Sequence, residues 1–174
     1  MEFQEREGVV AMGGKPLTLL GPELAVGEPA PDFRVVDAAL EPVRLSDFDG
    51  RARLISAVPS IDTGVCAMQT KRFNDELEHL PSDVVVMTIS MDLPFAQKRF
   101  CEAEKVEGMM MTSDHVWREF GLAYGVLIKD IGLLARSIFV VGKDGKLLYK
   151  QVVPELTDHP DYDAALAAAK AAAQ

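Results

Sequence analysis

Cys66 is the residue of this chain whose type and position most favour chemistry. A short apolar run, Leu54–Val58, is stopped by Pro59 and is typical of a strand in the core of a sheet. Beyond the cysteine, Phe73 and Leu77 recur at helical spacing, so Cys66 should lie in the first turn of a helix. The free N–H groups and the positive end of the helix dipole there favour a thiolate over a thiol. We therefore expect Cys66 to be a reactive nucleophile.

Two other side chains could act with this cysteine. The hydroxyl of Thr63 can accept one hydrogen bond and donate another, so it could orient substrate oxygens, and it could also cap the helix. Cys101 is the second cysteine, and burial of both cysteines as small apolar side chains is the plain alternative to redox chemistry. A metal site formed by the two cysteines and the three histidines is not expected, because their spacing matches no zinc pattern. No cofactor is expected either.

The composition is that of an ordinary globular protein. The chain has 174 residues, of which 48% are hydrophobic and 26% charged, enough for one domain with a proper core. The net charge of −9 and the lack of long basic runs argue against binding to nucleic acid or to an anionic membrane. No basic-then-apolar N-terminal segment and no apolar run of membrane-spanning length are present, so we expect a cytoplasmic protein. In such a reducing compartment two cysteines would pair transiently, which favours redox chemistry.

A strand and a second helix should follow the Cys66 helix. Residues 84–90 are β-branched and nearly continuous, as in a parallel strand covered on both faces. Asp92 should cap, and Pro94 should open, a helix that carries Cys101 at the edge of its apolar face. That face is expected to include Phe95 or Ala96, followed by Phe100 and Ala103.

The remaining elements complete an α/β fold. The further strands are a hairpin at 9–20, single strands at 33–36, 43–45 and 109–111, and a hairpin at 137–153 that turns at Gly145. One further helix should be capped by Ser113 and Asp114, bury Trp117 and end at Gly121. A closing helix should be capped by Asp161. This order predicts a thioredoxin-like α/β sandwich with an N-terminal β-hairpin extension. We expect a single domain over residues 1–174, with residues 1–26 as the extension.

The loop before Cys66 resembles the peroxiredoxin signature Pro-x-x-x-Thr-x-x-Cys, which Pro59, Thr63 and Cys66 match. The wider pattern is similar to the thiol peroxidase branch, the atypical two-cysteine peroxiredoxins. Four blocks carry this likeness in the right order: Ser60–Cys66 with Lys71–Asn74, Asp92–Cys101, Leu133–Arg136 and Pro160–Leu166. The resemblance extends from the opening hairpin nearly to the C-terminus. Position 64 is glycine where many relatives carry proline, which suggests a more mobile loop.

The resemblance implies how the site would handle a peroxide. Cys66 would attack it, and the guanidinium of Arg136, otherwise an unremarkable charge at a strand edge, would contact both the thiolate and the peroxide. Thr63 would orient the peroxide oxygens. Pro59, whose plain alternative role is to end the strand, would shield the thiolate from water and from over-oxidation.

Cys101 would act second in the resemblance-based scheme. It would condense with the sulfenic acid of Cys66 to give an intrachain disulfide. Lys98 and Lys105 lie at helical spacing from Cys101 and should favour its thiolate.

Two functions from different classes are compatible with these residues. The first is a peroxidase that reduces hydrogen peroxide and alkyl hydroperoxides, is recycled by thioredoxin and forms a homodimer, as the resemblance implies. The second is a redox-responsive binding protein that signals peroxide to a partner through the same disulfide. Thr63 and Arg136 favour the first, because a sensor needs a reactive thiol but no groups that orient a peroxide.

Overall fold

The fold is built on a seven-stranded sheet with the strand order β10-β9-β5-β6-β7-β3-β4. The structure is a computed structural model and describes residues 2–174. The strands of this sheet are β3 (Arg34–Val36), β4 (Pro42–Arg44), β5 (Arg53–Ala57), β6 (Val85–Ser90), β7 (Met110–Ser113), β9 (Ser137–Val141) and β10 (Leu147–Val152). The pairs β5–β6 and β6–β7 are parallel and the other pairs antiparallel, so the predicted β-α-β unit around Cys66 is confirmed.

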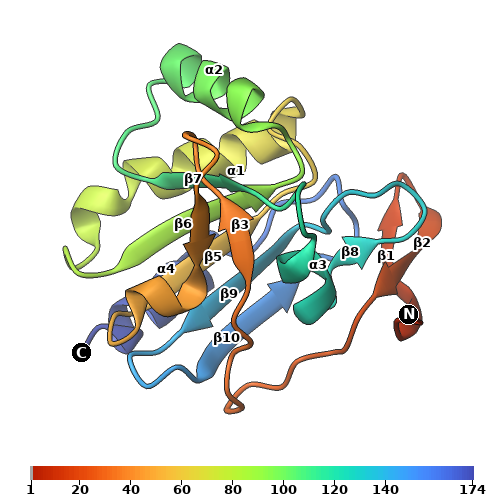
Figure 1. The fold of residues 1–174 in the computed structure, drawn as a ribbon, viewed down its shortest axis with the longest axis horizontal. Coiled ribbons are helices and arrows are strands. Elements are labelled where there is room, and N and C mark those ends of the chain that lie inside the picture. The colour runs from red at the N-terminus through yellow and green to blue at the C-terminus, as the bar shows by residue number, and fades with distance from the viewer. Residues whose placement is uncertain (1) are drawn as a thin grey trace.

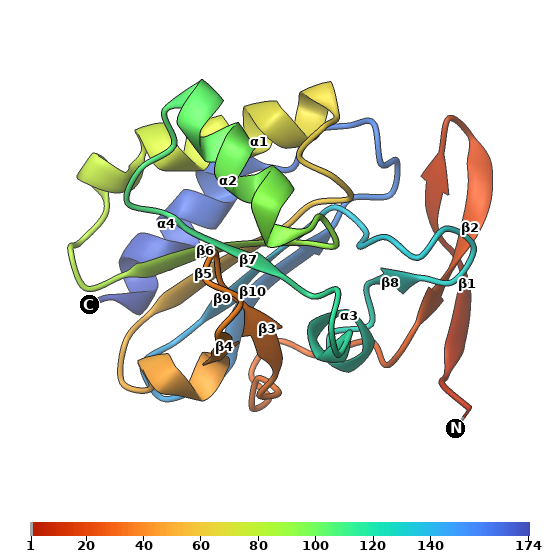
Figure 2. The ribbon, with the colours of Figure 1, turned by 45° about the horizontal axis from the view of Figure 1, so that its top comes forward.

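Helices cover both faces of this sheet. The α-helices are α1 (Gly64–Asp75), α2 (Pro94–Glu104), α3 (Glu119–Ala123) and α4 (Tyr162–Ala172), and 3₁₀ turns lie at Leu45–Phe48 and Leu77–His79. In Figure 1 and Figure 2, α1, α2 and α4 lie on one face, and α3 with the Leu45–Phe48 turn lies on the other. The predicted α/β sandwich is therefore confirmed. Asp161 caps α4 as predicted, because its carboxylate accepts a hydrogen bond from the Ala164 N–H at 3.0 Å.

The central strands divide the core into two apolar layers. Along β5, Leu54 packs into the layer beneath α1 and α4, which includes Cys66, whereas the next residue, Ile55, packs into the opposite layer. Successive side chains of a strand point to opposite faces, so a strand buried on both faces has to be apolar throughout. Burial on both faces explains the nearly continuous apolar runs of the central strands. The end of β5 lies directly beneath the start of α1.

The N-terminal hairpin packs against the side of this sandwich. It consists of β1 (Glu5–Met12) and β2 (Lys15–Leu20), and β8 (Leu127–Ile128) extends it to a three-stranded sheet. β8 was not predicted, since a strand of two residues leaves no pattern. The contact is close: a Cβ atom on Gly125, whose φ is +65°, would lie 2.0 Å from the carbonyl oxygen of Pro22. Only glycine fits this position.

The prediction for α2 was wrong in two respects. Asp92 does not cap the helix, because the N-cap residue is Leu93 and no side chain caps there. Of the predicted apolar positions, Phe100 packs against the core, but Phe95 is 69% exposed, and the buried residues of the helix are Pro94 and Gln97. Gln97 is buried because its amide nitrogen donates to the carbonyl of Thr112 at 2.7 Å, so the buried face of the helix includes a polar side chain. A count of apolar positions misses such a face.

The helix predicted after Ser113 was also wrong in its boundaries. The buried carboxylate of Asp114 accepts hydrogen bonds from the N–H groups of Phe120 and Gly121, so the helix starts at Glu119 and passes through Gly121. Burial raises the pKa of Asp114 to about 7 despite these two hydrogen bonds, which favour the charged form. Trp117 is only partly buried.

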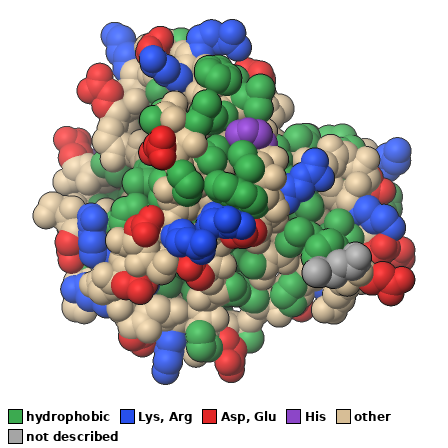
Figure 3. Space-filling view, viewed as in Figure 1, with side chains coloured by type: hydrophobic (Ala, Val, Ile, Leu, Met, Phe, Trp, Pro, Cys, Tyr) green, Lys and Arg blue, Asp and Glu red, His purple; other side chains and the backbone are tan. Residues whose placement is uncertain are grey.

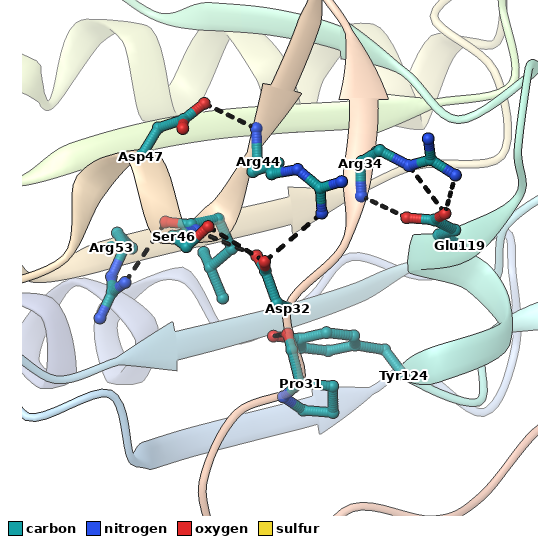
Figure 4. Close-up of polar contacts among 10 residues, drawn as sticks. Pro31, Asp32, Arg34, Arg44, Ser46, Asp47, Arg53, Glu119 and Tyr124 are labelled. Carbon is teal, nitrogen blue, oxygen red and sulfur yellow. Dashed lines mark hydrogen bonds and ion pairs between the residues drawn. The ribbon is translucent and has the colours of Figure 1, made fainter.

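Polar contacts fix the segment that leads into β3 (Figure 4). The Arg34 side chain forms a forked contact with the carboxylate of Glu119, which also accepts from the Arg34 N–H. The hydrogen bonds from Arg34 lower the pKa of Glu119. Arg34 also stacks over the ring of Trp117, 4.4 Å from its centroid, which explains why this tryptophan lies outside the core.

No helix within residues 2–174 is long and apolar enough to cross a membrane.

Candidate active site

Cys66 lies in the first turn of α1, as predicted, and is fully buried, with 0% exposure. β5 ends at Ala57, and the chain reaches the helix through Pro59, which is buried, and the loop that follows it. The sulfur belongs to the apolar layer that also contains Phe73. An anion on this sulfur therefore needs partners inside the protein, because water does not reach it in this form.

Arg136 supplies the main polar contact of that sulfur. Its Nη2 lies 3.1 Å from the Sγ of Cys66, and the arginine itself is 2% exposed. The same guanidinium donates twice to the carbonyl of Leu156, from Nε at 3.0 Å and from Nη2 at 2.8 Å. Arg136 directly precedes β9, so the central sheet fixes its backbone. Of its partners, only the sulfur of Cys66 can carry a full negative charge.

Gln69 completes this arrangement and was missed in the sequence. Its Oε1 accepts from Nη1 of Arg136 at 2.9 Å, and its Nε2 donates to the hydroxyl of Ser56 on β5 at 2.8 Å. Gln69 is fully buried one helical turn after Cys66. A glutamine on the buried face of an amphipathic helix is the signal that could have revealed it.

Thr63 occupies the N-cap position of α1 without capping it. Its hydroxyl donates to the carbonyl of Ser60 at 3.1 Å, and no side-chain hydrogen bond to the helix N–H groups is present at this N-cap. The capping role was therefore wrong. The side chain is exposed, and since its proton is used, the lone pairs of its oxygen remain free to accept a hydrogen bond.

A pocket of about 330 Å³ opens beside these residues. It combines side chains from the Cys66 loop, the N-terminal hairpin and the two segments next to Arg136: Met12, Pro59, Thr63, Gly64, Val65, Ile131, Leu133, Arg136, Leu156 and Thr157. The lining is mostly apolar, and Arg136 and the two threonines are its polar side chains. The structure thus brings together three of the predicted site residues, Pro59, Thr63 and Arg136, at a hollow next to Cys66.

Cys101 lies apart from this pocket, on α2. It is half-buried, a free thiol like Cys66, and packs against the same apolar layer, on the side of the sheet where α1 and α2 lie (Figure 2). Burial, and then the neighbouring carboxylate of Glu102, raise the pKa of the Cys101 thiol. The expected help from Lys98 and Lys105 was therefore wrong, because Glu102 and burial favour the protonated form. Residues 2–174 contain no cluster of three or more histidine, cysteine or acidic side chains suited to a metal ion.

Comparisons with known proteins agree on one group. The Redoxin family matches residues 25–166. The thiol peroxidase of Listeria innocua is 55% identical over 157 residues, which cover 90% of this chain and 94% of that protein. The thiol peroxidase of Bacillus subtilis is 49% identical over 162 residues, covering 93% and 96%. The crystal structure of a peroxiredoxin-like protein from Aquifex aeolicus is 40% identical, with a TM-score of 0.88 over 97% of this chain and 98% of that one.

Proposed function

Since this chain belongs to the redoxin family and is a thiol peroxidase of the peroxiredoxin type, we propose that Cys66 is the nucleophile that reduces peroxides. The observation that supports this proposal most directly is the contact between Arg136 and the sulfur of Cys66. A guanidinium buried to this degree is costly unless an anion balances it. Its other partners are the neutral oxygens of Gln69 and Leu156, so a Cys66 thiolate is the anion that fits this place.

The reaction starts with attack of the Cys66 thiolate on one peroxide oxygen. A sulfur–oxygen bond forms, the oxygen–oxygen bond breaks, and the departing oxygen takes a proton to leave as water or an alcohol. Negative charge moves from sulfur to that oxygen, and Arg136, whose side chain also lines the pocket, can stabilise it. The free lone pairs of Thr63 can accept the peroxide O–H and align the molecule. Buried Pro59 limits the access of water to the sulfur.

The pocket supports organic hydroperoxides as substrates in addition to hydrogen peroxide. Its volume exceeds what hydrogen peroxide needs, and Met12, Ile131 and Leu133 give it apolar walls on which an alkyl group can pack. We expect alkyl hydroperoxides to be reduced at least as efficiently as hydrogen peroxide.

Turnover requires Cys101. The sulfenic acid of Cys66 loses water on condensing with the Cys101 thiol to form an intrachain disulfide, which thioredoxin reduces. Disulfide bonding requires Cα atoms about 4.4–6.8 Å apart. Because Cys66 is fully buried within the first turn of α1, this turn and the loop at Gly64 have to unwind first.

A coupled assay tests the peroxidase function. Thioredoxin, thioredoxin reductase and NADPH are supplied with hydrogen peroxide or cumene hydroperoxide, and NADPH loss is followed. Cys66→Ser should abolish the loss of NADPH. Cys101→Ser, given a single equivalent of peroxide, should consume it and stop at the sulfenic acid. A non-reducing gel should show a faster-running monomer after oxidation, and a covalent dimer as main product would contradict the intrachain disulfide. A wild-type protein that forms the disulfide without turnover would instead indicate a redox switch.

We further propose that the protein is a cytoplasmic homodimer. Exposed Leu93, Phe95 and Val116 follow β6 and β7, two parallel neighbours that end at the same edge of the sheet. Figure 3 shows hydrophobic side chains gathered in the area between α2 and α3. Such a surface supports self-association, which sedimentation can test. Two cysteines in 174 residues are too few for a secreted disulfide scaffold, which supports a reducing compartment. We treat residues 1–174 as one domain, with residues 1–26 as its hairpin extension.

A further inference from the structure

Asp92 links the two cysteine-bearing segments. It lies between β6 and α2, in the connection that leads to Cys101. Its carboxylate reaches across to the loop before Cys66: Oδ1 accepts from the hydroxyl of Ser60 at 2.8 Å, and Oδ2 accepts from the N–H of Ile61 at 2.9 Å. The bonded residues are 31 and 32 positions away in the chain. Both carboxylate oxygens are therefore used to hold the loop rather than to cap α2.

Ser60 connects Asp92 to Thr63 through further hydrogen bonds. The hydroxyl of Ser60 accepts from the N–H of Asp62 at 3.2 Å, and its carbonyl accepts from both the N–H of Thr63, at 3.2 Å, and the Thr63 hydroxyl, at 3.1 Å. The carbonyl of Thr63 in turn accepts from the N–H of Ala67 at 3.0 Å, inside the first turn of α1. A continuous series of hydrogen bonds thus runs from Asp92 to the turn that contains Cys66.

The other bonded residue, Ile61, anchors the loop in the core. It is 2% exposed and packs in the same apolar layer as Cys66. Its N–H would be left without a protein partner inside this region if the carboxylate were removed, and a buried unpaired N–H group is costly. Asp92 therefore stabilises the conformation in which Ile61 is buried and Thr63 lines the pocket.

We propose that Asp92 is a positioning residue that holds the Cys66 loop closed and sets how readily the loop opens toward Cys101. This proposal rests on the peroxidase function proposed above. Attack on peroxide uses the closed loop, with Thr63 and Arg136 at the pocket, whereas disulfide formation uses the open one. Because the carboxylate belongs to the segment that carries Cys101, opening has to break its two hydrogen bonds.

The sulfenic acid of Cys66 can react in two competing ways, and their ratio depends on this opening. In the open loop, Cys66–SOH and Cys101–SH lose water and form the disulfide. In the closed loop, the deprotonated sulfenic acid attacks a second peroxide, which gives the sulfinate Cys66–SO₂⁻ and an alcohol or water. The ratio of sulfinate to disulfide at a given peroxide concentration therefore measures how long the loop stays closed.

The test compares Asp92→Ala with wild type by mass spectrometry after a single exposure to excess cumene hydroperoxide. Loss of hydrogen bonds to a charged group changes an opening equilibrium by about tenfold or more, so the sulfinate-to-disulfide ratio should fall by about that factor. Hydrogen exchange at the N–H groups of Thr63 and Ala67, which do not touch Asp92, should become faster. Asp92→Asn keeps an acceptor for Ile61 and a donor for Ser60, so it should restore most of the wild-type ratio.

Asp37→Ala serves as the matched control. Asp37 also accepts two hydrogen bonds, from the N–H groups of Ala39 at 2.8 Å and of Glu41 at 3.0 Å, but it lies in the β3–β4 turn. This variant should leave the ratio unchanged. Should Asp92→Ala not fold, Ser60→Ala removes one of the two bonds and should shift the ratio in the same direction by less.

The possible outcomes separate this proposal from the peroxidase function. An unchanged ratio in Asp92→Ala, or an equal fall in Asp37→Ala, would overturn the role of Asp92 while wild-type turnover still supports the peroxidase. Failure of Asp92→Asn to restore the ratio would also count against it. A wild-type protein that reduces no peroxide would overturn the peroxidase function itself.

Discussion

Replacing Arg136 by Met tests the charge at the centre of the proposed mechanism. The substitution keeps a long side chain in the pocket wall but removes four hydrogen bonds: one to the sulfur of Cys66, one to Gln69 and two to the carbonyl of Leu156. Only the first of these involves a reacting atom. The change therefore separates the stabilisation of the reacting charge from the shape of the pocket.

The expected effect on rate follows from the 3.1 Å contact. A positioned donor that stabilises charge developing in a transition state contributes roughly 10²–10³-fold, so peroxide reduction in Arg136→Met should slow by at least about 10². The substitution should change the free energy of unfolding less, because two contributions oppose each other: lost hydrogen bonds destabilise the fold and removal of a buried charge stabilises it. Oxygens of Gln69 and Leu156 lose their donors, at about 1–3 kcal/mol each, but a buried charge also disappears.

The assay is the second-order rate constant for consumption of the first equivalent of peroxide, measured without thioredoxin. Arg34→Met is a suitable control, because the partner of Arg34 is Glu119 of α3, the helix on the other face of the sheet from α1. It should react like wild type. A rate for Arg136→Met within about threefold of wild type, in a protein that remains folded, would refute the charge argument and leave this arginine a structural role.

Three further predictions concern other polar groups. Gln69→Leu should slow peroxide consumption by roughly tenfold, less than Arg136→Met, because the carbonyl of Leu156 still holds the guanidinium. For Asp114, the folded pKa of about 7 lies above the ordinary aspartate value of 3.8. Its contribution to the free energy of unfolding is therefore fully present below the lower pKa and is lost as the pH rises through about 7. Urea unfolding should show this loss, on the order of 4 kcal/mol at most, and Asp114→Asn should flatten the curve. Asp161→Ala should lower the stability of the protein by about 1 kcal/mol in thermal unfolding, without changing the rate of peroxide consumption.

The sequence predicted the parts of the fold and the site that depend on local patterns. Apolar runs, turn residues and spacing predict both hairpins, the buried strand that stops before Pro59 and the position of Cys66 in the first helical turn. Arg136 was found through the family resemblance alone, since a basic residue next to a strand has no local signature. Its contact with Cys66 joins residues 70 positions apart, which only the folded chain brings together.

Two of the predictions that failed share a physical cause. Asp92 and Asp114 were each taken as the cap of the helix that follows, because an acidic residue before a helix most often pairs with nearby N–H groups. In the structure Asp92 pairs with the Cys66 loop, and Asp114 pairs with N–H groups six and seven residues further on. Both follow the carboxyl ends of parallel strands, where loops from different parts of the chain meet and offer unpaired N–H groups.

The same reasoning explains why Gln69 and Gln97 were assigned no role. Helical periodicity sorts residues by polarity and places glutamine on the solvent side, yet both amides are buried at the layer between helix and sheet. Gln97 satisfies the carbonyl of Thr112, and Gln69 bridges the guanidinium of Arg136 and the hydroxyl of Ser56. A polar side chain on a buried helix face is stable only when such partners exist. Its presence therefore marks the place where the chain holds polar groups for a purpose other than packing, which at Gln69 is to orient the arginine that faces the sulfur.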